Sequence, residues 1–227
     1  MLFRSPVAML TTAGLDKIGV RVPAHHDAQT LLQAFGKPIA APSANPSGRI
    51  SHSTAKHVLD GLDGRLDLVL DGGSCESGLE STIIDCTGDA ARLLRPGGIT
   101  RGALAAALTA ANCNPQIDIA EPLADHENPV APGQLASHYA PNATVRLMAK
   151  TSTADEELIG FGTVSGAGKL ALNLSPSGDL VEAAVNLFSI LHAVDAADIA
   201  KIAIAPIPDT GLCEAINDRL RRAAAPR

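Results

Sequence analysis

The chain has 227 residues, of which 46% are hydrophobic and 2% aromatic, and its formal net charge is -6. A chain of this length forms one large core or two modest ones. The acidic balance, with one Tyr and no Trp, excludes a broad cationic surface for nucleic acid and a platform for stacking bases, so we expect no stable direct binding of nucleic acid.

No window approaches the roughly 18 apolar residues of a membrane span, and we expect a cytoplasmic protein with no membrane segment. The four cysteines, at positions 75, 86, 113 and 213, have no CxxC spacing. This scatter indicates reduced, mostly buried thiols, because zinc sites and disulfide frameworks use closer or paired spacings.

The first elements follow from short patterns. Residues 17–23 (KIGVRVP) predict a strand, and residues 27–35 a helix with Asp27 as its N-cap and Gly36 as its terminator. We expect a short buried strand at 38–42 and then a helix through 52–62, capped by Ser51 or Ser53. Further strands are expected at 66–70, 81–85 and 92–94, followed by an Ala-rich helix over 101–111 that Thr100 caps.

The second half has a different organisation. Periodicity disappears between Asn112 and Pro141, where Pro, Asp, Glu and Asn accumulate, and this composition indicates a linker. Beyond it we expect strands at 144–148, 158–162, 169–174 and 201–207 and helices at 178–194 and 211–223. The first of these helices should bury one face, formed by Val181, Ala184, Val185, Phe188 and Leu191.

Strands that alternate with amphipathic helices predict an α/β fold. We assign residues 1–112 to a first domain, residues 113–142 to the linker and residues 143–227 to a small Rossmann-like parallel α/β domain.

A polar loop is the most informative stretch. Residues 41–51 hold three serines and an Asn on a backbone shaped by Pro and Gly, between a predicted strand and a predicted helix. Hydroxyls and backbone N–H groups at a helix N-terminus suit phosphate. An ordinary turn has the same composition, so the residues alone leave both interpretations open.

Several motifs decide between them by resemblance. PSANPSGRIS resembles the loop of the YrdC-like family of threonylcarbamoyl-AMP synthases, and GVRVP, GLESTIID, LLRPGGIT and PGQLASHYAP occur in the order that this family shows. The resemblance continues into GLCEAINDRL and covers nearly the whole chain. It implies a truncated YrdC-like twisted sheet with helices in residues 1–112 and the C-terminal domain of the longer family members in residues 143–227.

The resemblance also implies an activity. The family joins L-threonine, bicarbonate and ATP into threonylcarbamoyl-AMP and pyrophosphate, for the threonylcarbamoyl modification of adenosine 37 in tRNA. Mg²⁺ accompanies ATP, and downstream tRNA threonylcarbamoyl-transfer proteins use the product. No catalytic residue is assigned, because the reaction proceeds by positioning and electrostatic stabilisation.

The same resemblance assigns binding residues. Arg21 suits the threonine carboxylate because its guanidinium binds two oxygens, and Arg95 suits the ATP phosphates. Tyr139, in the linker rather than in either core, would cap the nucleotide and exclude water. The remaining matches are Lys17, Ser43, Asn45 and Ser51 for ATP, and Ala41 and Ser81 for threonine.

One departure from the family and two rival functions accompany this interpretation. Family members carry a TVYGL-like segment and a Lys-x-Arg motif before GVRVP, and this chain contains neither, so we expect it to be incomplete by itself. An inactive remnant that binds nucleotide or protein partners is the main rival function. A carbamoyl-transfer maturation factor is disfavoured by the HYAP segment and the C-terminal domain.

Two patterns look like sites but fail on spacing. Residues 166–169 (GAGK) lack the first Gly and the final Ser or Thr of a phosphate loop. His25 and His26 have no third ligand at metal-binding spacing. We expect both to be turns.

Overall fold

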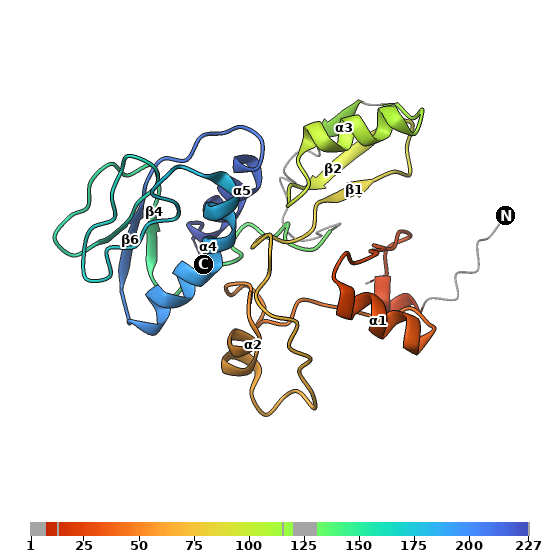
Figure 1. Ribbon diagram of the computed structural model, residues 1–227, viewed down its shortest axis with the longest axis horizontal. Coiled ribbons are helices and arrows are strands. Elements are labelled where there is room, and N and C mark those ends of the chain that lie inside the picture. Colours follow the sequence, from red (N-terminus) through yellow and green to blue (C-terminus); the bar gives the residue numbers. More distant parts are fainter. Residues whose placement is uncertain (1–7, 13, 115, 120–130, 227) are drawn as a thin grey trace. The chain divides into compact units, whose positions relative to one another are not determined.

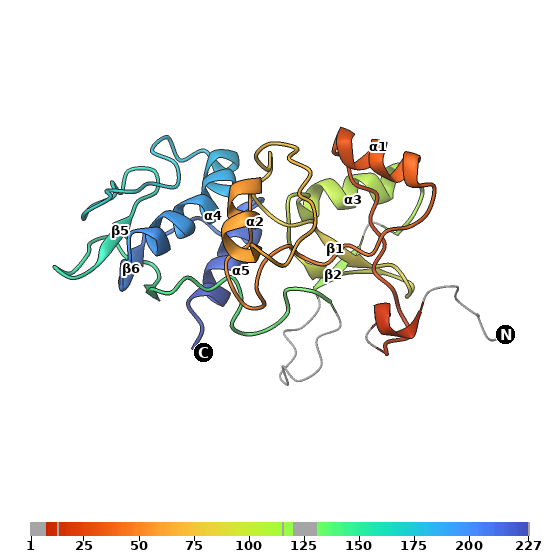
Figure 2. The same cartoon turned by 90° about the horizontal axis from the view of Figure 1, so that it is seen from below.

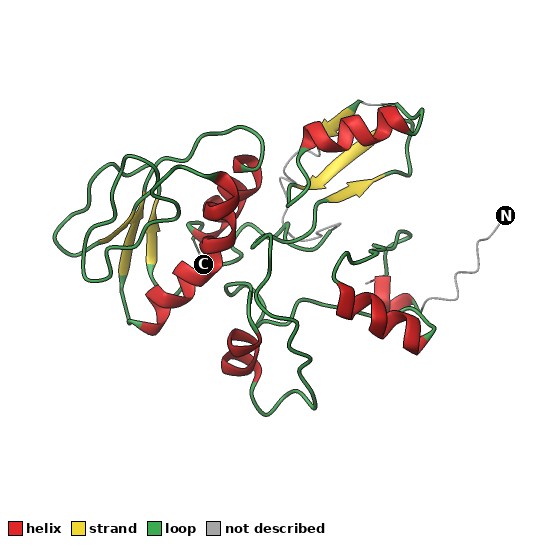
Figure 3. Cartoon of the chain, in the orientation of Figure 1, coloured by secondary structure: helices red, strands yellow, loops and turns green. Residues whose placement is uncertain are grey.

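The structure is a computed structural model that describes residues 8–12, 14–114, 116–119 and 131–226. The chain divides into two units, Met1–Ser43 and Ala44–Arg227. Figure 1 labels their elements, and Figure 3 separates helices, strands and loops by colour.

The first unit contains a short 3₁₀ helix, Met9–Thr12, and the helix α1, His26–Phe35. The N-cap of α1 is His25, so the prediction of Asp27 as the cap was wrong. Asp27 lies in the first turn instead, where a carboxylate favours the helix dipole. Gly36 ends α1 as predicted, with φ 68° and its N–H donated to the Leu32 carbonyl. None of the described side chains of this unit is buried.

Four predicted strands are absent from their positions. Residues 17–23, 38–42 and 66–70 form irregular backbone that is mostly exposed, so the buried strand expected at 38–42 was wrong. Residues 169–174 make only a single bridge, between Asn173 and Gly160. A strand is defined by its hydrogen-bonded partner, and alternating side chains alone do not supply one.

The second unit begins with α2, Ala55–Leu62, which Thr54 caps by accepting the His57 N–H at 3.2 Å. The predicted caps, Ser51 and Ser53, were wrong. The strands β1 (Ile83–Asp85) and β2 (Ala91–Arg95) pair antiparallel.

The helix α3 (Arg101–Ala110) then leads to β3 (Ile117–Ile119), which pairs parallel to β2. α3 lies over this mixed sheet, whose order is β1-β2-β3 (Figure 2). Thr100 caps α3 as predicted. β3 lies inside the predicted linker of residues 113–142, so part of that segment belongs to a sheet.

The C-terminal part is a small parallel sheet with helices, as predicted. Its strand order is β4-β6-β5, and both pairs are parallel. α4 and α5 pack with this sheet around one hydrophobic core (Figure 1). The elements are β4 (Thr144–Arg146), β5 (Glu157–Ile159), α4 (Leu180–Ala196), β6 (Lys201–Ile204) and α5 (Cys213–Ala223).

The largest core lies between these helices and strands. α4 buries Ala184, Phe188 and Leu191 as predicted, but Val181 is 61% exposed and Val185 is half-buried. The buried face is instead completed by Ala183, Leu187, Ile190 and Val194. Three residues from outside the C-terminal domain, Ile50, Leu79 and Tyr139, belong to the same core.

The cysteines are all free. Cys213 is buried, whereas Cys75, Cys86 and Cys113 are exposed, so the expectation of mostly buried thiols was wrong. In the described part of the chain no helix has both the length and the apolar character to cross a membrane.

Candidate functional site

The polar loop forms a closed turn. The Asn45 amide donates two hydrogen bonds of 3.1 Å, to the carbonyls of Pro46 and Arg49. The Arg49 N–H donates to the Pro46 carbonyl at 3.1 Å. Asn45 therefore stabilises the loop through its side chain.

The segment around Tyr139 runs beside this loop. Ala140 pairs with Arg49 in a parallel bridge and donates its N–H to the Gly48 carbonyl at 3.1 Å. The Arg49 guanidinium also donates to the Asn142 side-chain carbonyl at 2.7 Å. Two segments about ninety residues apart are thus joined by main-chain and side-chain bonds.

Ser51, at the end of the loop, binds a half-buried carboxylate. Its hydroxyl donates to Glu80 at 2.5 Å, and the other oxygen of Glu80 accepts the Arg219 Nε–H at 2.7 Å. Burial alone would raise the pKa of the Glu80 carboxyl, but the Arg219 charge and the Ser51 hydroxyl hold that pKa below its ordinary value. Glu80 is therefore ionised near neutral pH.

Arg95 connects Ser81 to the segment before Tyr139. Its Nε and Nη2 groups donate to the Ser81 carbonyl at 3.1 and 2.9 Å, and its Nη1 donates to the Pro132 carbonyl at 3.2 Å. Burial lowers the pKa of Arg95. A guanidinium remains charged after such a shift, because its ordinary pKa is above 12.

Tyr139 is a core residue, which corrects its predicted place outside either core. Its side chain is 1% exposed, and its ring lies 5.7 Å from that of Phe188 on α4. The guanidinium carbon of Arg219 lies 5.1 Å from the Tyr139 ring centroid. Burial raises the pKa of the Tyr139 phenol, so the phenol is neutral at physiological pH.

Ser51, Ser81, Arg95 and Tyr139 are therefore brought into one neighbourhood, with the Asn45 loop beside it. The other predicted residues lie in the first unit and are all exposed. They are Lys17, Arg21, Ala41 and Ser43. Their roles stay predictions.

Known proteins share this arrangement of elements. A family model described as "Telomere recombination" matches residues 1–97, and one described as "Threonylcarbamoyl-AMP synthase, C-terminal domain" matches residues 99–225, more than half of the chain. A threonylcarbamoyl-AMP synthase of Pyrococcus abyssi is 34% identical over 97% of the chain and 68% of its own length. The chain belongs to the threonylcarbamoyl-AMP synthase family.

Other members of the threonylcarbamoyl-AMP synthase family are similarly close. The Bacillus subtilis enzyme is 35% identical over 95% of the chain and 65% of its own length. The crystal structure of P. abyssi Sua5 complexed with L-threonine superimposes with a TM-score of 0.80 at 32% identity, covering 96% of the chain and 67% of that protein. The chain thus spans about two thirds of the length of these relatives.

Two residues of this neighbourhood were not predicted. Glu80 and Arg219 are 139 positions apart, and they occur in the motifs GLESTIID and GLCEAINDRL. Each motif contains the charged residue, and this was the one feature of the sequence that could have marked Glu80 and Arg219 as candidates. Nothing in the sequence indicates that these two charges meet.

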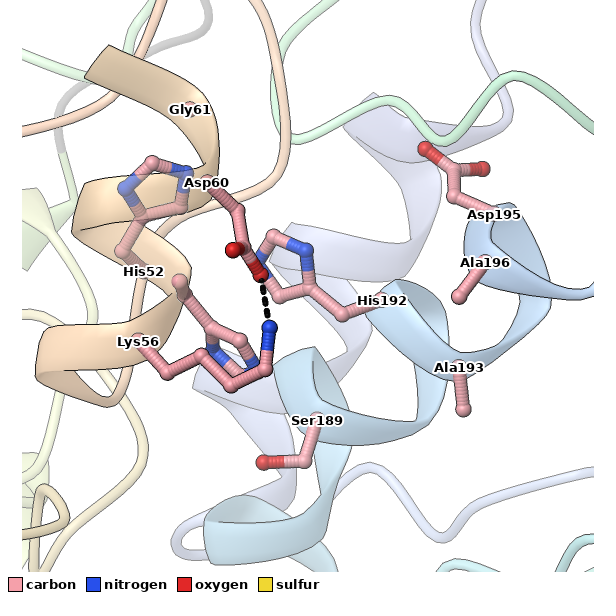
Figure 4. Close-up of a pocket in the computed structure, with 10 residues that line it drawn as sticks. His52, Lys56, Asp60, Gly61, Ser189, His192, Ala193, Asp195 and Ala196 are labelled. Atoms are coloured by element: carbon pink, nitrogen blue, oxygen red, sulfur yellow. Dashed lines mark hydrogen bonds and ion pairs between the residues drawn. The ribbon is translucent and has the colours of Figure 1, made fainter. Parts of the chain in front are cut away.

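A cavity lies between α2 and α4 (Figure 4). Its volume is about 450 Å³, and none of the predicted ATP or threonine residues of this family member lines it. The rings of His57 and His192 stack at 4.1 Å, with His52 at 5.3 Å from His192. Burial and the His57 charge lower the pKa of His192 to about 4. The Lys56 ammonium pairs with Asp60 at 2.6 Å.

The two patterns that fail on spacing lie in different surroundings. Residues 166–169 wrap the buried Glu157 carboxylate, which accepts the Leu170 N–H at 2.9 Å. An acidic group at this turn opposes phosphate binding. The turn expected at His25 and His26 was wrong, because His26 begins α1 and His25 is its N-cap. Within the described ranges no three His, Cys, Asp or Glu side chains form a group that could hold a metal ion.

Proposed function

We propose that the chain takes part in making threonylcarbamoyl-AMP from L-threonine, bicarbonate and ATP, with release of pyrophosphate. The observation that carries this proposal is the convergence of Ser51, Ser81, Arg95 and Tyr139 around the Glu80–Arg219 pair. Family membership supplies the reaction, and the L-threonine complex of the P. abyssi relative supports the amino-acid substrate.

The chemistry needs binding and charge stabilisation more than a nucleophile of the protein. The threonine amine and bicarbonate first form a carbamate with loss of water. A carbamate oxygen then forms a bond to the α-phosphorus of ATP, and the bond from that phosphorus to the β-phosphate oxygen breaks, which releases pyrophosphate. Negative charge accumulates on the leaving pyrophosphate, so cationic side chains placed there lower the barrier. In the proposal, ATP contacts Lys17, Ser43, Asn45, Ser51, Arg95 and Tyr139, and threonine contacts Arg21, Ala41 and Ser81.

In this proposal Mg²⁺ binds to the chain together with ATP, as the ion of the nucleotide. The donor groups in the described part of the chain do not fit a protein-held ion, whereas the phosphate oxygens of ATP are ligands that Mg²⁺ prefers. No step therefore depends on a metal ligand of the protein.

The product is a reactive mixed anhydride that serves the modification of adenosine 37 in tRNA. Downstream tRNA threonylcarbamoyl-transfer proteins would receive it, in the cytoplasm. A buried Tyr139 with a neutral phenol fits a role in excluding water from such a product.

Pyrophosphate release from the purified chain tests the proposal. Release should require ATP, L-threonine and bicarbonate together. Arg95→Ala should lower ATP use at least about tenfold, since a charge-assisted bond is lost. Arg92→Ala is the matched control, because Arg92 lies on the same strand and is exposed. Equal effects of the two substitutions would contradict the assignment of Arg95.

Arg21→Lys tests the threonine half of the site. A lysine keeps the charge but loses the two-pronged geometry that a carboxylate accepts, so the threonine concentration for half-maximal rate should rise. Unaltered dependence on threonine would remove Arg21 from the site.

One observation favours a second candidate function. The unit that carries Lys17, Arg21, Ala41 and Ser43 has no buried side chain among its described residues. A chain that binds ligands or protein partners without turnover is consistent with that exposure. Saturable binding of ATP or L-threonine without any pyrophosphate release would support this candidate over the synthase.

A further inference from the structure

Arg219, on α5, is the most deeply buried charged side chain near the proposed site. It is 1% exposed, and arginine is almost never buried to this degree unless it is paired. Its partners come from other parts of the chain. Its Nε–H donates to Glu80 at 2.7 Å and its Nη1–H donates to Asp218 at 2.6 Å.

Two of the contacts of Arg219 lead to predicted ligand residues. Glu80 accepts the Ser51 hydroxyl through its other oxygen and is the chain neighbour of Ser81. On another side, the Arg219 guanidinium lies against the Tyr139 ring. One side chain of the C-terminal domain thus touches the polar loop, the Ser81 turn and the Tyr139 segment, directly or through one carboxylate.

The backbone near Tyr139 is held by the same helix. Arg222 accepts the His138 N–H on its carbonyl at 3.3 Å and donates from its side chain to the Leu135 carbonyl at 2.8 Å. Arg219 and Arg222 are three positions apart, so they lie on neighbouring turns of α5. The helix therefore fixes both the main chain and the aromatic ring of this segment.

We propose that Arg219 is a positioning residue, through which the C-terminal domain sets the geometry of the ATP- and threonine-binding groups. This inference rests on the proposed function and adds a role for the C-terminal domain in the same site. Arg219 touches no substrate in this account. It acts by keeping Glu80 ionised and in place and by its contact with the Tyr139 ring.

The consequence of removing Arg219 follows from the burial of Glu80. A carboxylate in this position needs a cation, and without one it binds a proton or moves toward water. A protonated Glu80 can donate to Ser51, where it now accepts. The Ser51 hydroxyl and the adjacent Ser81 would then reorient, although neither residue was substituted.

Ligand binding is the first readout. We expect Arg219→Met to weaken the binding of ATP and of L-threonine, titrated separately by calorimetry, by about tenfold or more. Arg219→Lys should recover part of the affinity, because the charge returns without the guanidinium fork. Arg221→Met is the matched control, since Arg221 is exposed on the same helix, and it should bind both ligands as the unaltered chain does.

The phenol titration of Tyr139 tests the contact with Arg219 directly and separates a lost contact from unfolding. Tyr139 is the only tyrosine and there is no tryptophan, so phenolate absorbance reports this residue alone. The Arg219 charge opposes the rise that burial causes in the pKa of Tyr139. In a folded Arg219→Met chain that pKa should rise further, whereas unfolding would return it to about 10.

A double variant keeps the test informative if Arg219→Met fails to fold. Arg219→Met combined with Glu80→Gln leaves no unpaired Glu80 charge, so it should fold and still bind both ligands weakly. Unchanged affinity in folded Arg219 variants, or a Tyr139 pKa equal to that of Arg221→Met, would overturn the positioning role. An unaltered chain that binds neither ligand would overturn the proposed function and this role together. The Tyr139 titration would still show whether Arg219 contacts Tyr139, independently of whether the chain has an ATP and threonine site.

Discussion

Gly133→Ala is the sharpest test of how the Tyr139 segment is packed. Gly133 has φ +84°, and a Cβ built on it would lie 2.4 Å from the Tyr139 hydroxyl and 3.2 Å from Cδ of Arg95. A tyrosine that is 1% exposed has little room to move away. The substitution therefore combines a left-handed backbone with an overpacked contact.

A control at another glycine of the same chain separates the backbone strain from the overpacking. Gly64 has φ +71° and nothing within 4 Å of its Cβ position. Gly64→Ala should cost only the backbone strain of about 1–2 kcal/mol. Gly133→Ala should cost the same strain plus about 1–3 kcal/mol of overpacking.

The assay is thermal unfolding followed by circular dichroism and by the fluorescence of the single tyrosine. The excess destabilisation of Gly133→Ala over Gly64→Ala should lower Tm by a further ~2–12 °C, at about 2–4 °C per kcal/mol for a unit of this size. The tyrosine emission should change in Gly133→Ala only. Equal Tm values for the two variants would refute the close packing of Gly133 on Tyr139.

Three further predictions concern the pH dependence of stability, the core and the Glu80 carboxylate. The pKa of His192 is about 4, against 6.5 ordinarily, so the unfolded chain binds more protons between these values and the stability of the folded chain should fall as pH drops from 6.5 to 4. Because His192 is only half-buried, solvent screening makes this loss smaller than that of a fully buried group. Urea unfolding of His192→Gln should show a flatter pH profile, and an equally steep one would exclude this residue as the cause. Leu191→Ala should lower the free energy of unfolding in urea by about 2–5 kcal/mol, because Leu191 is 1% exposed. Val181→Ala, on the exposed side of α4, should lower it by less than about 0.5 kcal/mol. Similar losses for the two variants would contradict the buried face of α4. Ser51→Ala should lower the free energy of unfolding by about 1.5–3 kcal/mol, since a hydroxyl bonded to the Glu80 carboxylate is lost. An unchanged free energy of unfolding in the same assay would mean that water replaces the hydroxyl.

Local patterns predicted the elements whose stability is local. Thr100 and Gly36 mark helix ends because capping requires one side chain or one left-handed residue. The helices α4 and α5 and the strands β4, β5 and β6 were also predicted, since apolar periodicity in these segments corresponds to one continuous core.

The failed predictions are those that depend on distant partners. The apolar run at 66–70 resembles a strand, but its backbone pairs with none of the described strands. In the same way, β3 was missed because its three residues pair with β2 across α3. For short segments, the partner determines the conformation more than the local sequence does.

The same distinction between local patterns and distant partners applies to the candidate site. Motif resemblance indicated Ser51, Ser81, Arg95 and Tyr139 one at a time, and the structure brings these four together. The pair that links them, Glu80 and Arg219, is a contact between two motifs in different parts of the chain. Such a contact depends on tertiary packing, so neither composition nor spacing predicts it.

Calorimetric titration of ATP and of L-threonine into the unaltered chain tests the central claim most directly. We predict saturable heats for both ligands, with the ATP signal weakened in Arg95→Ala and the L-threonine signal weakened in Arg21→Lys. Absence of binding for both ligands, or affinities that neither substitution changes, would contradict the existence of this ATP and threonine site.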